Sequence, residues 1–118
     1  MSEYDTIARR YIDTWNEQDP ERRKKLIEDL YTADATYTDP LAAVSGPAGI
    51  DEFVAGAQQQ FAGLSFALGP VDGHHDIARF TWYLGTPDAE PVVVGFDVIA
   101  VTDGRIARVS GFLDKVPA

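Results

Sequence analysis

The hydrophobic pattern of the chain changes its period near residue 63, and this change constrains the fold more than any other feature of the sequence. Before that point, apolar residues recur every three or four positions over residues 3–18, 20–31 and 50–61, as they do on helices with one buried face. After it, apolar residues alternate with polar ones or run together, as they do in strands. Helices followed by strands are typical of an α+β fold.

The second half of the chain predicts a sheet of hairpin-connected strands. Strands are expected at 64–71, 75–84, 91–101 and 105–113, with a short earlier strand at 35–39 and a loop at 41–47. Asp103-Gly104 is a strong signal for a tight hairpin. Three helices can cover only one face of such a sheet. We therefore expect an α+β fold: a cone-shaped, curved antiparallel β-sheet with three N-terminal-half helices packed on its concave face.

Composition limits the class of protein. A length of 118 residues with 45% hydrophobic residues predicts a single domain over residues 1–118. The absence of cysteine excludes disulfides and thiolate metal sites. We expect a cytoplasmic protein with no membrane partner, because no apolar run is long enough to span a bilayer and the N-terminus does not resemble a signal peptide. A net charge of -9 argues against nucleic acid as a partner.

Basic residues are concentrated near the start of the chain. Six of the ten lie within the first 25 residues. We interpret this segment as a solvated helix face, with an acidic partner as the alternative.

Asp97 is the only ionisable residue in the apolar run 92–101. Burying an unpaired carboxylate is costly, so its side chain must be hydrogen-bonded, paired with a base or protonated through a raised pKa. A structural ion pair with Arg79, Arg105 or Arg108 explains the residue equally well at this point, as does a strand face open to water.

Other polar residues allow a structural and a functional interpretation. Asp39 precedes Pro40 at a predicted strand end, where an aspartate commonly accepts a backbone amide and forms a turn. Tyr11 continues the apolar stripe of the first helix and is expected to be a core residue with its hydroxyl at the edge. His74 and His75 predict a loop or strand edge and no metal site, because neighbours on a strand point to opposite faces and a third histidine is lacking.

Four segments carry a recognisable combination of residues: RYIDTWN at 10–16, LYTADATYTDP at 30–40, GPAGIDEF at 46–53 and GFDV at 95–98. Together they resemble the nuclear-transport-factor-2-like superfamily, and within it the SnoaL-like branch and the ketosteroid isomerases. The resemblance covers nearly the whole chain and implies a pocket between the helices and the concave face of the sheet. In the ketosteroid isomerases, a first-helix tyrosine, an aspartate before proline and an aspartate in an apolar late strand form the catalytic set. Tyr11, Asp39 and Asp97 match these three positions.

The resemblance implies acid–base chemistry that needs no cofactor. Moving a proton beside a carbonyl requires a base and donors that stabilise the enolate oxygen. Asp39 would be the base, and Tyr11 and a protonated Asp97 the oxyanion donors. The expected protein is an isomerase or lyase for a small apolar carbonyl compound of the steroid, terpenoid or polyketide class. The alternative is a non-catalytic small-molecule-binding or dimeric interaction module of the same fold.

The two faces of the predicted sheet have separate expected roles. The concave side should hold an apolar ligand, lined by Trp15, Tyr31, Phe53, Phe80, Trp82, Val93 and Leu113. The opposite side carries an apolar patch made by Tyr83, Phe96, Val98 and Phe112. Because such a patch is unfavourable in water, we expect a homodimer that forms through the sheet.

Overall fold

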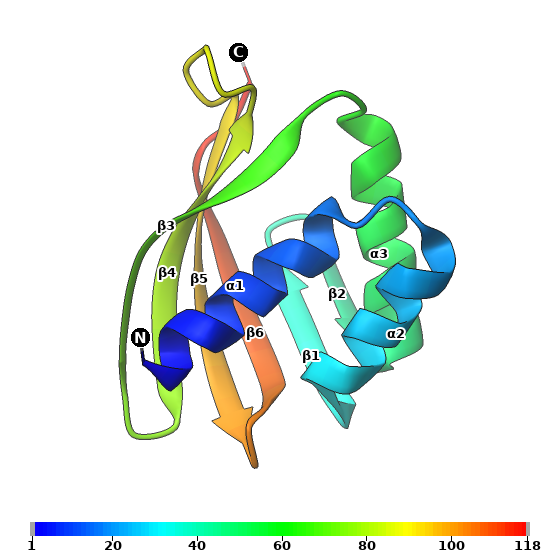
Figure 1. Cartoon of the computed structure of the whole chain (residues 1–118), viewed down its shortest axis with the longest axis vertical. Coiled ribbons are helices and arrows are strands. Elements are labelled where there is room, and N and C mark those ends of the chain that lie inside the picture. Colours follow the sequence, from blue (N-terminus) through cyan, green and yellow to red (C-terminus); the bar gives the residue numbers. More distant parts are fainter. Residues whose placement is uncertain (1, 118) are drawn as a thin grey trace.

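The computed structural model describes residues 2–117 and, within them, shows three helices and one six-stranded sheet (Figure 1). The helices are α1 (Glu3–Asn16), α2 (Pro20–Leu30) and α3 (Gly46–Gln60). The strands are β1 (Tyr31–Asp39), β2 (Ala42–Ser45), β3 (Ser65–His74), β4 (Ile77–Gly85), β5 (Val93–Thr102) and β6 (Arg105–Lys115). The predicted α+β fold is confirmed.

The strands lie in the order β2-β1-β6-β5-β4-β3. Neighbouring strands are antiparallel except β1 and β6, which run parallel. An irregularity between Leu68 and Val71 interrupts the pairing of β3 with β4, and bulges of this kind bend and twist a sheet. The resulting curved, unclosed sheet bends around α1, which crosses its concave face, while α2 and α3 lie beside β1 and β2 (Figure 1).

Two segments differ from what the sequence predicts. Residues 42–45 pair with β1 as an edge strand, although the whole of 41–47 is expected to be a loop. Four residues are too few to show a clear alternation, and Asp39 accepts hydrogen bonds from the backbone N–H groups of Leu41 and Ala42, which reverses the chain into this strand. The strand expected from residue 75 begins at Ile77, so His75 lies in the β3–β4 turn with a φ of 51°, consistent with the loop or strand edge expected for the two histidines.

The sequence signals for the start of α2 and for the β5–β6 turn are confirmed. Asp19 caps α2 by accepting a hydrogen bond from the backbone N–H of Arg22 at 2.9 Å, and Pro20 occupies the first turn. Asp103 and Gly104 both have positive φ, 51° and 77°, in the β5–β6 turn. Such angles at both central residues are those of the tight hairpin turn that matches the twist of a sheet.

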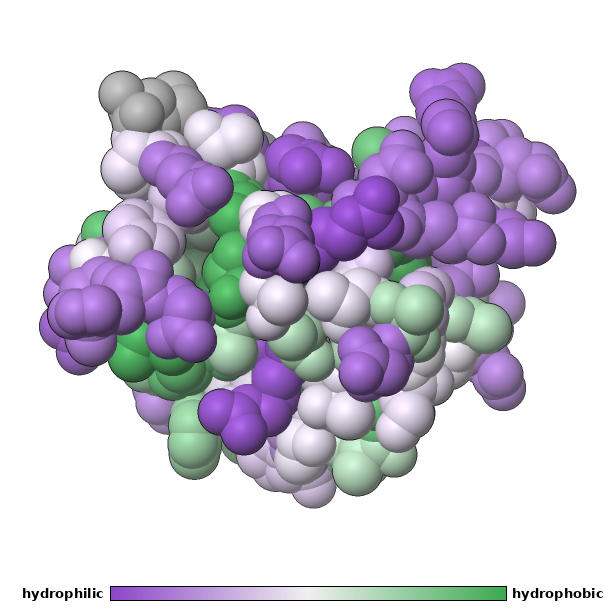
Figure 2. All heavy atoms as spheres, turned by 90° about the horizontal axis from the view of Figure 1, so that it is seen from below, coloured by the Kyte–Doolittle hydropathy of each residue, from purple (hydrophilic) through white to green (hydrophobic). Residues whose placement is uncertain are grey.

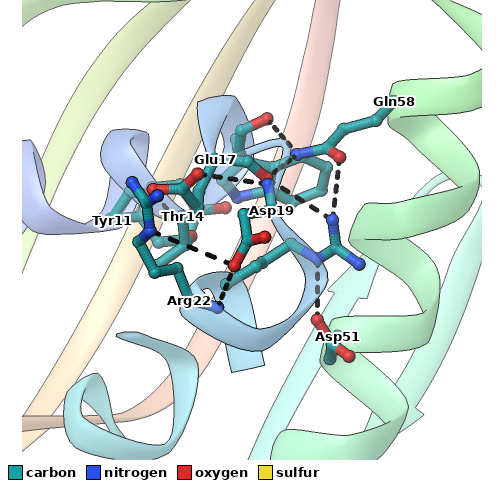
Figure 3. Close-up of polar contacts among 9 residues, drawn as sticks. Tyr11, Thr14, Glu17, Asp19, Arg22, Asp51 and Gln58 are labelled. Carbon is teal, nitrogen blue, oxygen red and sulfur yellow. Dashed lines mark hydrogen bonds and ion pairs between the residues drawn. The ribbon is translucent and has the colours of Figure 1, made fainter. Parts of the chain in front are cut away.

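A buried arginine joins the three helices, although the other five basic residues of the first 25 are exposed, as the solvated-face interpretation expects. Arg23 is 5% exposed and donates hydrogen bonds to Asp51 at 2.8 Å and Gln58 at 2.9 Å, both on α3. The Gln58 amide donates in turn to the backbone oxygens of Trp15 and Glu17 at the end of α1. Figure 3 shows Asp51 and Gln58 facing the junction of the other two helices. The carboxylate partner makes burial of the guanidinium tolerable.

The two ends of the fold differ in how they are covered. The end of the molecule seen in Figure 2, which is the lower end of Figure 1, presents mainly hydrophilic side chains with narrow hydrophobic strips between them. Toward the opposite end, where β3 begins and β6 ends, the packing between α3 and the sheet leaves a cavity. Among the described residues, no helix combines the length and the hydrophobicity needed to cross a membrane.

Candidate functional site

The cavity has a volume of about 280 Å³ and lies between α1, α3 and the concave face of the sheet. Its wall is largely aromatic and aliphatic. It is lined by Tyr11, Ile12, Trp15, Tyr37, Asp39, Leu41, Phe53, Ala57, Gln60, Phe61, Phe66, Trp82, Leu84, Val93, Leu113, Val116 and Pro117. A concave apolar site with few polar groups is the usual form of a small-molecule site.

Strand register brings the two predicted carboxyl groups together at this site. Thr38 pairs with Ser110, which places Asp39 beside Gly111, and Gly111 pairs with Asp97. A Cβ atom at Gly111 would lie 2.8 Å from Oδ1 of Asp97 and 3.3 Å from Cβ of Asp39. The glycine therefore leaves the space in which the two acidic side chains approach each other.

Asp97 is buried, 2% exposed, and accepts a hydrogen bond at Oδ2 from the Tyr11 hydroxyl at 2.7 Å. Burial raises the pKa of Asp97 from 3.8 to about 6. The Tyr11 hydrogen bond and, less strongly, the nearby Trp82 indole act to lower this pKa, whereas the charge of Asp39 acts to raise it. Asp97 is thus half protonated at about pH 6, within about one pH unit of neutrality.

The arginines considered as partners for Asp97 lie elsewhere. Arg79 is exposed and contacts Asp72 at 3.5 Å, and Arg105 donates to a backbone carbonyl of α2 at 3.2 Å. Arg108 is exposed. Within residues 2–117, no lysine or arginine forms an ion pair with Asp97, so the structural ion-pair interpretation is wrong.

Asp39 combines a turn-forming role with a place in the cavity wall. Its Oδ1 accepts the backbone N–H groups of Leu41 at 2.8 Å and Ala42 at 2.9 Å, as the structural interpretation expected. Its Oδ2 accepts a hydrogen bond from the Tyr37 hydroxyl at 2.7 Å. Three donors thus fix the orientation of a carboxyl group that also faces the cavity.

Tyr37 is the site residue that sequence reasoning missed. It is 3% exposed, and its ring packs against Phe53 at 5.3 Å and Trp15 at 5.9 Å between centroids. Burial, followed by the charge of Asp97 and the hydrogen bond to Asp39, raises the pKa of Tyr37. Strand parity was the available signal, because Tyr37 lies two residues before Asp39 on β1 and so shares its face.

The charge of Asp97 acts on two further buried tyrosines, Tyr11 and Tyr31. Burial, followed by the charge of Asp97, raises the pKa of both tyrosines. The Tyr31 hydroxyl is buried and has no hydrogen-bond partner among the described residues. Both phenols remain protonated at neutral pH, and Tyr11 is the one that donates to Asp97.

The structure places five of the seven expected pocket residues in the cavity wall: Trp15, Phe53, Trp82, Val93 and Leu113. Trp82 faces inward because β4 has the expected register, and its indole lies over Gly95, where a Cβ atom would come within 2.0 Å of the ring.

Two expected pocket residues and one expected donor lie outside the cavity lining. Phe80 is fully buried and is covered by the Tyr11 ring, whose centroid is 5.3 Å away. Tyr31 begins β1 beside Ile106, at the opposite end of the strand from the cavity. Asp97 does not line the cavity either, because the Tyr11 hydroxyl donates to its Oδ2 and lies between it and the cavity.

The two histidines lie outside the cavity lining. His74 ends β3 and His75 follows in the turn, where their Nδ1 atoms approach to 3.1 Å. The expectation that the two side chains point apart was wrong, because the positive φ of His75 breaks the alternation of the strand. No cluster of three or more histidine or acidic side chains within residues 2–117 is placed to hold a metal ion.

Comparison with known proteins identifies the family. A sequence model of the SnoaL-like domain matches residues 8–109. A protein of the SnoaL-like family from Agrobacterium tumefaciens, named as a candidate isomerase, is 41% identical; the match covers 97% of this chain and 99% of that one, with a TM-score of 0.90. The chain therefore belongs to the SnoaL-like family, as its sequence motifs predicted.

Two further solved structures share the fold at lower identity. A candidate ketosteroid isomerase from Kribbella flavida is 23% identical, covering 98% of this chain and 81% of that one with a TM-score of 0.73. A candidate SnoaL-like polyketide cyclase from Jannaschia is 19% identical, covering 95% and 85% with a TM-score of 0.78. No curated protein matches the sequence. These likenesses extend to the fold, and the chemistry must be argued from the site.

Proposed function

We propose that the protein is an acid–base enzyme that moves a proton beside the carbonyl group of a small apolar compound, without a cofactor. The observation that carries this proposal is that the side chains of Asp39 and Asp97 flank Gly111 at the end of an apolar cavity, with no basic partner on Asp97 among the described residues. Such a pair separates a base from an acid by environment alone.

Asp39 is the base in this proposal. It faces the cavity, and three hydrogen bonds hold its carboxyl group in one orientation. A fixed carboxylate beside a bound ketone can take the α-proton without first rearranging, which is where much of the advantage of an enzymatic base arises.

Tyr11 and Asp97 stabilise the enolate oxygen in series in this proposal. Tyr11 lines the cavity and so reaches the ligand, whereas Asp97 lies behind it. A protonated Asp97 would donate to the Tyr11 oxygen, leaving the Tyr11 hydroxyl free to donate to the ligand. Asp97 is then a positioning residue that acts through Tyr11.

This arrangement predicts a pH dependence. The chain of donors requires protonated Asp97, whose pKa is about 6 in the free protein. The kcat/KM for proton exchange should therefore fall as pH rises through about 6, because that limb reports the ionisation of the free enzyme. A value that stays constant from pH 5 to pH 8 contradicts the serial arrangement.

The test needs a ketone with acidic α-protons and no knowledge of the natural substrate. Wild-type protein should accelerate the exchange of the α-protons of β-tetralone into deuterated water, followed by proton NMR. Asp39→Asn should lower that acceleration by about a hundredfold to ten-thousandfold, the usual contribution of a general base. Its amide can still accept both backbone N–H groups, so the turn is kept.

Asp34→Asn is the matched control, since Asp34 is an exposed residue of the same strand that lies outside the cavity lining. It should exchange β-tetralone at the wild-type rate. Wild-type protein that binds β-tetralone yet does not accelerate exchange removes the enzymatic proposal.

One observation favours the alternative, a small-molecule-binding module without turnover. The three hydrogen bonds to Asp39 are also what a purely structural turn aspartate makes. Under this alternative β-tetralone binds, and wild-type protein and Asp39→Asn both leave the exchange rate at the solvent background.

We further propose that the protein forms a homodimer through the outer face of the sheet. Phe96 on β5 pairs with Thr81 on one side and Phe112 on the other, and Phe112 is 56% exposed. The adjacent side chains of Phe96 and Phe112 are a candidate for contact with a second copy. Sedimentation at micromolar concentration should give a dimer for the wild type and a monomer for Phe112→Asp, and a wild-type monomer contradicts the proposal.

A further inference from the structure

We infer that the ligand of this cavity is an uncharged compound of one or two rings, and that both a four-ring steroid and a carboxylate are disfavoured. The inference rests on the proposed function only in assigning the ligand a carbonyl group. The size and the charge of the ligand follow from the volume of the cavity and from the side chains that line it.

The volume sets the size. In another protein, a dry cavity of about 150 Å³ binds benzene, which corresponds to about 25 Å³ of cavity for each non-hydrogen atom. At this ratio, a cavity of about 280 Å³ holds about 11 non-hydrogen atoms, or two fused six-membered rings. The carbon nucleus of a steroid exceeds that number by about half. Its remaining rings would extend past the mouth.

The wall is rigid enough for this limit to matter. Trp15 lies 5.3 Å from Phe66 and 6.0 Å from Phe53 between ring centroids, and Phe66 lies 5.4 Å from Trp82. Rings that support one another in this way cannot move aside singly without losing contact with a neighbour. The Trp82 indole also lies directly against the backbone of Gly95, so it has no room to move toward the sheet.

The charge of the wall sets the charge of the ligand. Asp39 is the only acidic or basic side chain among the described lining residues, and Asp97 lies close behind. A carboxylate ligand would lose its hydration and find no cation in return, facing an acidic group instead. The net charge of -9 acts in the same direction over longer distances.

The flat aromatic wall favours a ligand with a planar or unsaturated ring. Aromatic faces attract ring edges and also attract cations, so an organic ammonium ion is the competing occupant. An uncharged ligand is favoured over the cation, because both oxygens of Asp39 already accept hydrogen bonds from three donors, and Asp97 has the Tyr11 hydroxyl as its partner and does not reach the cavity.

Two series of probes measured by calorimetry at pH 7 test size and charge separately. The first increases the size of an uncharged ketone: cyclohexanone, β-tetralone and testosterone. The second changes charge at constant size: β-tetralone, β-aminotetralin as a cation and tetralin-β-carboxylate as an anion. We expect affinity to rise about tenfold to a hundredfold from cyclohexanone to β-tetralone and then to stay within about threefold for testosterone. The anion should bind at least about tenfold more weakly than β-tetralone.

Three results overturn the inference. Testosterone binding more than about tenfold tighter than β-tetralone means that four rings are buried. A carboxylate that binds as well as the ketone means that the wall does not select by charge. An amine that binds tighter than the ketone makes the cavity a site for organic cations.

A cavity variant provides a gain of binding. Phe66→Ala removes a ring from between Trp15 and Trp82 and should raise the affinity for testosterone about tenfold relative to β-tetralone. Leu26→Ala, a partly exposed position on α2 outside the cavity lining, is the control and should leave both affinities unchanged. No relative gain in Phe66→Ala, with the variant folded, counts against the size limit.

The binding series and the exchange assay fail independently. If the affinities follow the expected order but β-tetralone is not exchanged, the size and charge inference stands and the enzymatic proposal is lost. If β-tetralone is exchanged but testosterone binds much tighter, the proton-transfer function stands and the inference is lost.

Discussion

The end of β1 and the middle of β5 each present an aspartate to the same small region, and the two environments differ. At the end of β1 the chain reverses, which frees two backbone N–H groups for Asp39, and a tyrosine hydroxyl adds a third donor. In the middle of β5 the backbone is paired with β4 on one side and β6 on the other. Among residues 2–117, Asp97 therefore has no backbone donor, and Tyr11 is the one side chain that donates to it at regular geometry.

The difference teaches that position within a strand can assign opposite roles to identical side chains. A strand end supplies backbone donors that orient a carboxylate, whereas a paired strand interior supplies none and leaves burial to dominate. Burial raises the pKa of Asp97 to about 6. The proposed acid and base roles in this site thus follow from strand topology, with Gly111 between the two side chains.

The largest expected effect is on the dependence of stability on pH. The pKa of Asp97 rises from 3.8 to about 6 on folding, so the protonated form favours the folded state. Stability from this group is fully present below pH 3.8 and is lost as pH rises through 6. The shift corresponds to about 3 kcal/mol. Unfolding free energies of the wild type and Asp97→Asn should diverge by about 2.5 kcal/mol between pH 4 and pH 8, since part of the loss has already occurred at pH 4, with the asparagine variant favoured at high pH.

This divergence isolates Asp97, because the other ionisable groups are common to both proteins. Urea unfolding at several pH values is the appropriate measurement. If the difference in unfolding free energy between the two proteins is the same at pH 4 and pH 8, Asp97 does not change its ionisation over this range, and the contrast with Asp39 disappears.

The next effect concerns ligand binding through Tyr11. β-Naphthol mimics an enolate, and Asp97→Asn should bind it nearly as well as the wild type because the amide also donates. Asp97→Ala leaves the Tyr11 hydroxyl without its buried partner and should lose about 1 to 3 kcal/mol of binding free energy. Calorimetry at pH 5.5, where the wild-type acid is largely protonated, gives the comparison. Equal losses in both variants would mean that the donor is unimportant.

A third prediction addresses the space between the carboxyl groups. In Gly111→Ala, the new methyl group meets Oδ1 of Asp97 at 2.8 Å, which should destabilise the protein by about 1 to 3 kcal/mol through overpacking. Gly56→Ala is the control, because nothing lies within 4 Å of its Cβ position on an exposed part of α3. It should stabilise the helix by about 0.5 to 1 kcal/mol. Thermal unfolding of both variants checks the opposite signs.

The sequence predicts the elements and the faces well for physical reasons that can be named. Strand parity places Trp82 inward and puts Asp97 on the buried face of β5, because side chains alternate strictly along a paired strand. The start of α2 at Asp19-Pro20 follows from local capping chemistry. The short strand β2 is not predictable in this way, because its pairing depends on a turn made by one side chain.

Depth within the site is what the sequence could not supply. Parity says that Phe80 and Asp97 face inward, but whether they reach the cavity depends on Tyr11, which comes from another element and covers both. Tyr37 was overlooked for the converse reason. Its parity with Asp39 is visible in the sequence, yet its hydroxyl becomes meaningful only when the carboxyl group is found 2.7 Å away.

The smallest expected effect separates the two tyrosines that serve the two carboxyl groups. The Tyr11 hydrogen bond lowers the pKa of Asp97, so Tyr11→Phe should move the midpoint of the pH-dependent loss of stability above 6. Tyr37→Phe removes a hydrogen bond to Asp39 instead and should cost about 1 kcal/mol of stability at every pH while leaving that midpoint in place. Each variant loses one phenolic hydroxyl from a buried ring that packs against Trp15, so each is the control for the other. Unfolding free energies between pH 4 and pH 8 distinguish them. If both midpoints move equally, Tyr37 acts on Asp97 as Tyr11 does, and the division of roles between a strand end and a strand interior must be abandoned.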